Sequence, residues 1–173
     1  MSMRLRPLVA AAAIAVSSCV ALPAMAGPAE MDQLAAYVGD WKGQGVMVGG
    51  EKPESFRCRM QVAKGNQAKI NYAGRCTLVN FNLSVSGTIA FNDKNRRYEA
   101  IMSSNAGFSG IAVGRITGKS ISFDLSEQTV DKGGNAVRIG SRIMLINDTI
   151  TIDFEIEFNN SGNVLTAEVP FRR

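Results

Sequence analysis

Apolar and polar residues alternate with a period of two along most of the chain, from residue 41 to residue 171. Such alternation is typical of β-strands that bury one face and expose the other. Turn-forming clusters such as Lys64-Gly65-Asn66 and Asn147-Asp148 interrupt it at short intervals. The pattern predicts ten strands, at residues 41–48, 56–63, 69–79, 82–92, 97–103, 108–116, 120–126, 136–146, 149–159 and 163–171.

These segments follow one another without helices between them, so we expect each strand to pair with the next in an antiparallel meander. A closed barrel and a two-sheet sandwich both give every strand one apolar face. The barrel is favoured, because sandwiches usually need long crossing connections and because closure removes exposed strand edges. The predicted fold class is therefore all-β, an up-and-down antiparallel β-barrel.

One hairpin has a predictable register. A two-residue turn at Asn147-Asp148 places Ile143 opposite Ile152 on an apolar face. On the polar face the same register places arginines opposite carboxylates, in the pairs Arg142–Asp153 and Arg138–Glu157. A slip of one residue would bury these charges, so the register is well specified.

The first 26 residues have the composition of a secretory signal peptide. Arg4 and Arg6 precede an apolar run, and Ala24-Met25-Ala26 is typical of a cleavage site. We predict a signal peptide at 1–26 and a single barrel domain at 27–173, without a transmembrane segment, in the periplasm or secreted. Because Val16-Ser17-Ser18-Cys19 resembles a bacterial lipobox, a lipoprotein anchored through Cys19 is the alternative.

The predicted export also affects the expected state of the cysteines. The hairpin between segments 56–63 and 69–79 places Cys58 opposite Cys76, both on the apolar face. Directly opposed residues of antiparallel strands lie within bridging distance. We predict a Cys58–Cys76 disulfide, since disulfides persist in oxidising compartments. Two reduced, buried thiols are the alternative.

Composition excludes several kinds of chemistry. The chain has no histidine, which excludes Ser-His-Asp and Cys-His catalysis and histidine-ligated zinc. Loss of Arg4 and Arg6 with the signal lowers the net charge from +4 to +2. This balance gives no reason to expect a nucleic-acid partner. No metal site is predicted, and no catalytic constellation stands out, so we expect a protein that is not an enzyme.

Several large or polar side chains have inward parity and form the predicted ligand-binding set. These are Met60, Tyr72, Tyr98, Met102, Phe123, Ser141 and Phe154. They either fill the barrel as core or line an apolar cavity, because ten strands leave more room than eight. The inward hydroxyls need hydrogen-bond partners, and a ligand could supply one.

A short helix is predicted before the first strand, because Met31, Leu34, Ala35 and Val38 share one face. Residues 39–45 follow, with the pattern G-x-W-x-G-x-G. Together with the strands, this arrangement resembles lipocalin-like (calycin) barrels, most closely the nitrobindin-type ten-stranded barrels. The resemblance implies that Trp41 lies across one end of the barrel, that the helix caps that end, and that Gly39 and Gly43 are structural.

The same resemblance raises the question of haem. Nitrobindin-type barrels hold haem through a histidine near the C-terminus, which this chain lacks. Ligation through Tyr or Met is chemically possible, but nothing singles out such a residue. We therefore retain the fold and an apolar pocket, and predict no cofactor.

Three functions remain. The first is an exported bacterial barrel that binds a small hydrophobic molecule in its interior. The second is a periplasmic protein-interaction module, similar to barrel inhibitors of secreted proteases, which would use residues 27–38 or loops near 49–55 and 127–135. The third is an enzyme with a histidine-free pocket. A basic outer side, formed by Arg57, Arg59, Lys64, Lys69 and Arg75, is either a solvated face or a contact for an acidic partner or anionic lipid headgroups.

Overall fold

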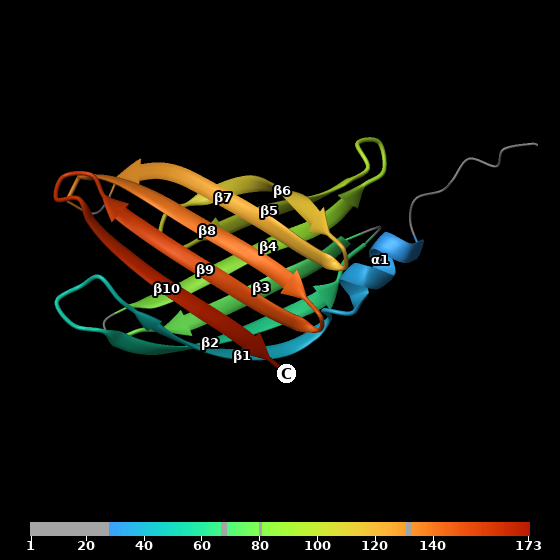
Figure 1. Ribbon diagram of the computed structural model, residues 1–173, viewed down its shortest axis with the longest axis horizontal. Helices are drawn as coiled ribbons and strands as arrows, with labels where there is room; N and C mark the ends of the chain where they lie inside the picture. The colour runs from blue at the N-terminus through green and yellow to red at the C-terminus, as the bar shows by residue number, and fades with distance from the viewer. Residues whose placement is uncertain (1–27, 67–68, 80, 131–132) are drawn as a thin grey trace, which may run out of the picture.

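A closed barrel of ten antiparallel strands forms the molecule, with one short helix at one end (Figure 1). The computed structural model describes residues 28–66, 69–79, 81–130 and 133–173, so the predicted signal peptide and Cys19 lie outside the described residues. The elements are α1 (Pro28–Ala35), β1 (Gly39–Met47), β2 (Glu54–Lys64), β3 (Lys69–Thr77), β4 (Asn82–Asn92), β5 (Arg97–Ser104), β6 (Ser109–Thr117), β7 (Ser120–Val130), β8 (Ala136–Ile146), β9 (Thr149–Phe158) and β10 (Asn163–Arg172).

Each strand pairs with the next along the chain, and β1 closes the barrel by pairing with β10. The predicted all-β class, up-and-down order and strand number are confirmed. The largest boundary difference is at β7, which continues to Val130 although the apolar alternation ends near residue 126. Backbone pairing with β8 extends to Val130 opposite Ala136, so the ladder outlasts the hydrophobic signal.

The predicted registers are confirmed at both hairpins. Ile143 lies opposite Ile152, and Cys58 lies opposite Cys76 and forms a disulfide with it. The predicted Arg138–Glu157 ion pair is also present.

The predicted Arg142–Asp153 ion pair is wrong, although the two residues are in register. The Arg142 guanidinium binds Asp124 instead, which lies opposite it on the other neighbouring strand, β7. Two carboxylates thus flank one arginine. Among the described residues, Asp153 Oδ1 remains buried without a hydrogen-bond partner.

Helix α1 covers one end of the barrel, as expected. Leu34 is fully buried, and the Tyr98 hydroxyl donates a hydrogen bond to the Glu30 carbonyl at 3.1 Å. The helix ends at Ala35, so Val38 is exposed rather than part of the apolar stripe. Tyr37 is buried in its place.

Trp41 packs against the segment that follows α1. Its indole N–H donates a hydrogen bond to the Tyr37 carbonyl at 2.9 Å, and the two rings stack. The Arg173 guanidinium lies 4.6 Å from the indole centroid on a cation–π contact. Trp41 is 1% exposed, so α1, Tyr37 and the C-terminus together bury it at this end.

Two glycines flank Trp41, and each has a specific structural reason. Gly39 begins β1 with a φ of +145°, which side-chain-bearing residues rarely adopt. Gly43 faces inward, where an added Cβ would lie 2.7 Å from a Val169 methyl group. Within the described residues, no helix is long and apolar enough to cross a membrane.

Candidate binding cavity and its mouth

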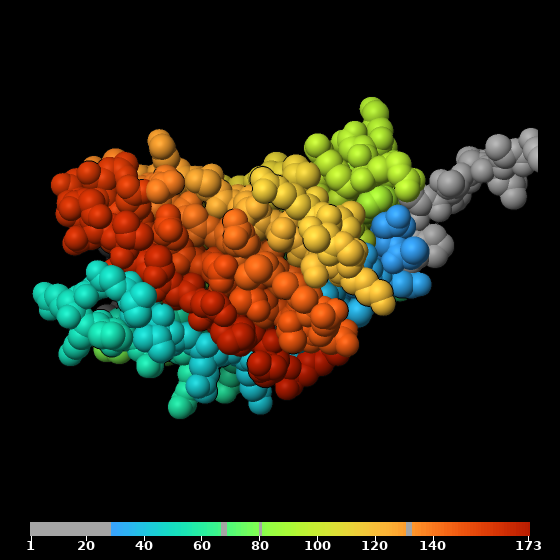
Figure 2. Space-filling view, in the orientation of Figure 1, coloured from blue at the N-terminus to red at the C-terminus, as the bar shows by residue number. Residues whose placement is uncertain are grey.

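An apolar cavity of about 140 Å³ occupies the half of the barrel away from α1. Its lining includes Phe81 and Ala106, which belong to the β3–β4 and β5–β6 turns and are partly exposed. The cavity therefore reaches the surface at that end, which we call the mouth. Figure 2 shows the contrast between the ends: α1 covers one, whereas the β1–β2 and β9–β10 hairpins stand apart at the other.

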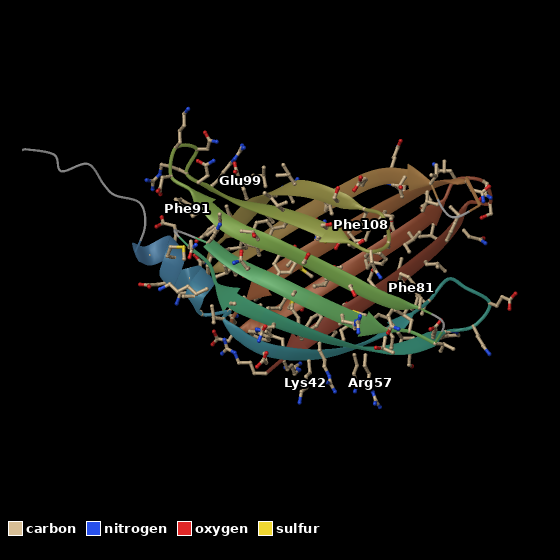
Figure 3. All side chains as sticks on the ribbon, turned by 180° about the vertical axis from the view of Figure 1, so that it is seen from behind. Lys42, Arg57, Phe81, Phe91, Glu99 and Phe108 are labelled. Carbon is tan, nitrogen blue, oxygen red and sulfur yellow. A yellow bond between two sulfur atoms is a disulfide. The ribbon has the colours of Figure 1, made fainter. Side chains whose placement is uncertain are left out.

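The position of the cavity follows from the sizes of the inward side chains. Small inward residues near its centre, Gly74, Ser141 and Ala167, leave space on β3, β8 and β10. The α1 half is instead filled by large side chains with at most 7% exposure, namely Trp41, Phe91, Tyr98, Ile121, Phe123 and Leu145. Figure 3 shows Phe91 near α1, with Phe108 and Phe81 toward the mouth.

Inward glycines let aromatic rings lie flat against the wall. At Gly87 an added Cβ would meet the Tyr72 ring and the Ile101 carbonyl, and at Gly45 it would lie 2.7 Å from the Phe56 ring. Tyr72 and Phe56 both line the cavity. Pairing of large with small inward residues is the usual way in which small barrels are filled.

Five of the seven residues in the predicted ligand-binding set line this cavity. They are Met60, Tyr72, Met102, Ser141 and Phe154. The structure places the other two elsewhere. Tyr98 hydrogen bonds to α1, and Phe123 packs over Gly114 in the filled half.

Sequence reasoning missed several lining residues. Phe56 has inward parity in a predicted strand, so the signal that selected Met60 applied equally to it. Leu78 likewise has inward parity in the predicted strand 69–79. Phe81 had no such signal, because it lies in the tight β3–β4 turn, where its carbonyl accepts a hydrogen bond from the Leu78 N–H at 2.9 Å, and turns carry no two-residue periodicity.

The three inward hydroxyls differ in their hydrogen bonding. Tyr72 donates to the Ile101 carbonyl at 3.4 Å, and its burial raises the pKa of the phenol. Tyr98 is within 3.2 Å of the Gln33 side-chain oxygen as well as bonded to Glu30. Ser141 is only 7% exposed and makes no side-chain hydrogen bond among the described residues. Its hydroxyl therefore differs from that of Tyr72, the other hydroxyl of the cavity lining, which has a partner.

A closed ten-stranded barrel with a helical cap and an internal apolar cavity is a calycin-like barrel. The sequence matches, over residues 30–168, the family described as THAP4-like, heme-binding beta-barrel domain. The chain belongs to this family. No curated protein matches the sequence.

Two solved structures show the same fold. Rv2717c from M. tuberculosis has a TM-score of 0.57 and 17% identity, covering 85% of this chain and 99% of that chain. The S-type phycobiliprotein lyase CPES from Guillardia theta has a TM-score of 0.53 and 11% identity, covering 81% of this chain and 89% of that chain. At these identities the likeness concerns the fold alone.

The cavity does not fit the haem that the family description names. Pockets for drug-sized ligands measure about 300–1,000 Å³, and this cavity has about 140 Å³. The chain has no histidine, and Cys58 and Cys76 are joined to each other. The Tyr72 phenol is kept protonated by burial and bonded to a carbonyl. The thioethers of Met47, Met60 and Met102 remain as candidate donors in the lining.

The segments proposed for a protease-inhibitor-like module have mixed positions. Residues 28–35 form α1 and are held by the buried Leu34, so they are not a free binding segment. Residues 49–53 are exposed, whereas 127–130 belong to β7 and 131–132 lie outside the described residues. No group of three or more metal-ligating side chains occurs in the described part of the chain.

Proposed function

We propose that this protein is an exported bacterial barrel that binds a small apolar molecule in its interior and performs no catalysis. The observation that supports the proposal is the cavity itself, which is enclosed by apolar side chains and open at one end. Apolar cavities of roughly 150 Å³ stay dry and bind molecules of the size of benzene. The ligand is accordingly a molecule of about one ring.

Ser141 adds a polar preference to this ligand. A ligand that hydrogen bonds to the Ser141 hydroxyl gains roughly 0.5–1.5 kcal/mol. We therefore expect an apolar molecule with a single hydroxyl or carbonyl group to bind more tightly than its hydrocarbon counterpart. p-Cresol and toluene are suitable probes, because they differ in one hydroxyl.

The test uses one substitution in two places. Ser141→Leu adds apolar volume inside the cavity, and Ser126→Leu makes the same change on the exposed face of β7. Calorimetry with toluene and p-cresol, together with the methyl NMR signals of Met60 and Met102, reports binding. We expect both probes to bind the native protein and Ser126→Leu, and neither to bind Ser141→Leu.

Two results would count against the proposal. One is a native protein that binds neither probe and purifies without a small molecule visible in native mass spectrometry. The other is toluene binding to a folded Ser141→Leu variant with native affinity. Capture of a specific protein by the empty barrel would favour the interaction module instead.

A further inference from the structure

A row of four cationic side chains crosses the outer wall of the barrel. Arg172 on β10 lies directly opposite Lys42 on β1, Lys42 opposite Arg59 on β2, and Arg59 opposite Arg75 on β3. All four are exposed, and Arg57 is exposed on the same face of β2. We call these five residues the basic wall. Figure 3 shows Lys42 and Arg57 side by side and directed away from the barrel.

The basic wall is not neutralised within the protein. None of its five residues forms an ion pair with a described residue, whereas Arg97, Arg115, Arg138 and Arg142 all do. The neighbouring carboxylate on the same face of β1 is Asp40, which accepts a long hydrogen bond of 3.4 Å from Gln61. Like charges placed directly opposite each other on adjacent strands are destabilising. An anionic partner would relieve this repulsion.

The surface beside the wall leaves room for such a partner. Lys42 and Arg59 lie between two shallow outer grooves of about 1040 and 500 Å³. Ala73 and Ser84 provide small, neutral lining in the larger groove, with Asp40 at one side. Negatively charged groups can therefore approach the cations without displacing bulky side chains.

Exposed apolar side chains lie in the β3–β4 turn next to the basic wall, and at the end of β1, where they line a groove with Asp153 and Glu168. Val79 and Phe81, which are 75% and 43% exposed, follow β3 in the turn just beyond Arg75. Val46 and Val48, at the end of β1, are 47% and 44% exposed. We call these four residues the apolar rim. Phe81 also lines the cavity, so the rim is continuous with the mouth.

We propose that the basic wall and the apolar rim dock the barrel on a membrane surface rich in anionic lipids, with the mouth at the level of the lipid headgroups. Each Lys or Arg near an anionic surface gains free energy from its potential, and apolar side chains inserted at the interface supply the second signal that stable attachment needs. A lipid surface accounts for both features together, since it offers a sheet of negative charge above an apolar layer.

Acidic side chains near the mouth limit the strength of this attraction. Glu51 and Glu54 lie in or beside the β1–β2 connection, with Lys52 between them, and Glu168 lines an outer groove with Val46 and Arg57. Together with Asp40 these are four carboxylates, against the five cations of the basic wall and Lys52, so the net charge of the docking side remains positive. This inference goes beyond the proposed ligand binding, because docking requires no occupant in the cavity.

Vesicle binding with matched charge variants tests the wall. The protein is mixed with vesicles of phosphatidylcholine alone and with vesicles that also contain phosphatidylglycerol, and binding is measured by co-sedimentation. The triple variant Arg57→Gln, Arg59→Gln, Arg75→Gln removes three wall charges. The control, Lys94→Gln, Arg115→Gln, Lys119→Gln, removes three exposed cations elsewhere.

We expect binding to the anionic vesicles only, weakened by added salt. The wall variant should bind about a hundredfold more weakly, at about a factor of five per charge. The control should keep at least most of its affinity. Equal losses in both variants, or equal binding to both kinds of vesicle, would overturn the proposal. Binding to soluble polyphosphate or an acidic protein but not to anionic vesicles would also overturn it.

Fluorescence tests the rim independently. The chain has one tryptophan, Trp41, which is 1% exposed and should not respond to vesicles. Phe81→Trp places a reporter in the rim, and Ile111→Trp places one at an exposed position of β6. The emission of Phe81→Trp should shift to the blue on anionic vesicles, and that of Ile111→Trp should not. A shift of Ile111→Trp alone would mean that another side docks.

These outcomes are separable from ligand binding. Docking with no toluene binding would leave this inference standing and remove the proposed function. Toluene binding by a protein that ignores anionic vesicles would do the reverse. Far-ultraviolet circular dichroism of every variant confirms that the barrel is intact.

Discussion

Reduction of the Cys58–Cys76 disulfide should lower the free energy of unfolding by about 3 kcal/mol. The bridge joins two residues 18 positions apart in the chain, and both lie on the inner face of the β2–β3 hairpin. In the chain-entropy account, a closed loop of this length restricts the unfolded chain, and opening it restores the lost entropy. We expect the backbone hydrogen bonds between β2 and β3 to stay the same in the folded protein after reduction.

Chemical reduction is a cleaner perturbation than substitution. Cys58 is 2% exposed, so Cys58→Ala would also leave a small void, whereas reduction retains both sulfur atoms. The double variant Cys58→Ala, Cys76→Ala should therefore be less stable than the reduced protein. For a chain of this size, 3 kcal/mol corresponds to a melting temperature lower by roughly 6–12 °C.

Equilibrium urea unfolding measures the difference, with Trp41 as the fluorescent probe. Because Trp41 lies opposite Met60, the inward neighbour of Cys58 on β2, far-ultraviolet circular dichroism is followed in parallel to report the whole barrel. The oxidised and the reduced protein should each unfold in a single cooperative transition. Unfolding free energies that agree within about 1 kcal/mol would refute the reasoning, since the loop-closure effect would then be absent.

Three further predictions follow from single contacts. Arg59→Gln should raise the free energy of unfolding by roughly 0.2–1 kcal/mol at low salt, since Arg59 lies between Lys42 and Arg75; urea titration would show no gain if the row carried no repulsion. Burial raises the pKa of Tyr98 from 10.0 to about 12, and it also raises the pKa of Tyr72. The unfolded chain therefore loses these protons at lower pH than the folded protein does. The free energy of unfolding should be constant below about pH 10 and fall as pH rises through about 12. The fall should be shallower in Tyr98→Phe, which also loses about 1 kcal/mol with its hydrogen bond to α1; an unchanged alkaline profile would contradict this assignment. Gly87→Ala should cost roughly 1–3 kcal/mol by forcing a Cβ against Tyr72 and the Ile101 carbonyl, whereas Gly140→Ala, whose new Cβ would lie 3.7 Å from Glu155, should be tolerated; equal melting temperatures would show that the wall yields.

The fold was predictable because the local sequence of each strand shows which of its faces points into the barrel. Inward and outward residues alternate, and short turns force neighbours to pair, so the closed order of strands and both hairpin registers followed from the sequence. The errors occurred where two neighbours compete for one residue. Arg142 has a carboxylate opposite it on each neighbouring strand, and the three-dimensional structure is needed to show that Asp124 binds it.

The helix shows a second limit. Four apolar residues at helical spacing include Val38, yet the chain leaves the helix at Ala35 so that Tyr37 can bury its ring beside Trp41. The favourable packing of an aromatic pair outweighs one more turn of an isolated helix, whose own stability is marginal at this length. Spacing alone does not reveal that competition.

The cavity depends on a coordinate that the alternation lacks, namely the height of each side chain along the barrel axis. Parity assigns Tyr72, Phe123 and Ser141 to the interior alike, but strand tilt and stagger place Phe123 in the filled half and the other two around the cavity. Space remains where glycine, alanine and serine from different strands reach the same height, and it closes where tryptophan and tyrosine do. The same stagger places Arg75 next to the β3–β4 turn and the exposed Phe81, whereas Arg172, next to the Arg173–Trp41 contact, lies toward the α1 end. A ligand site and a docking surface can thus share one mouth, with Phe81, Arg59 and Arg75 contributing to both.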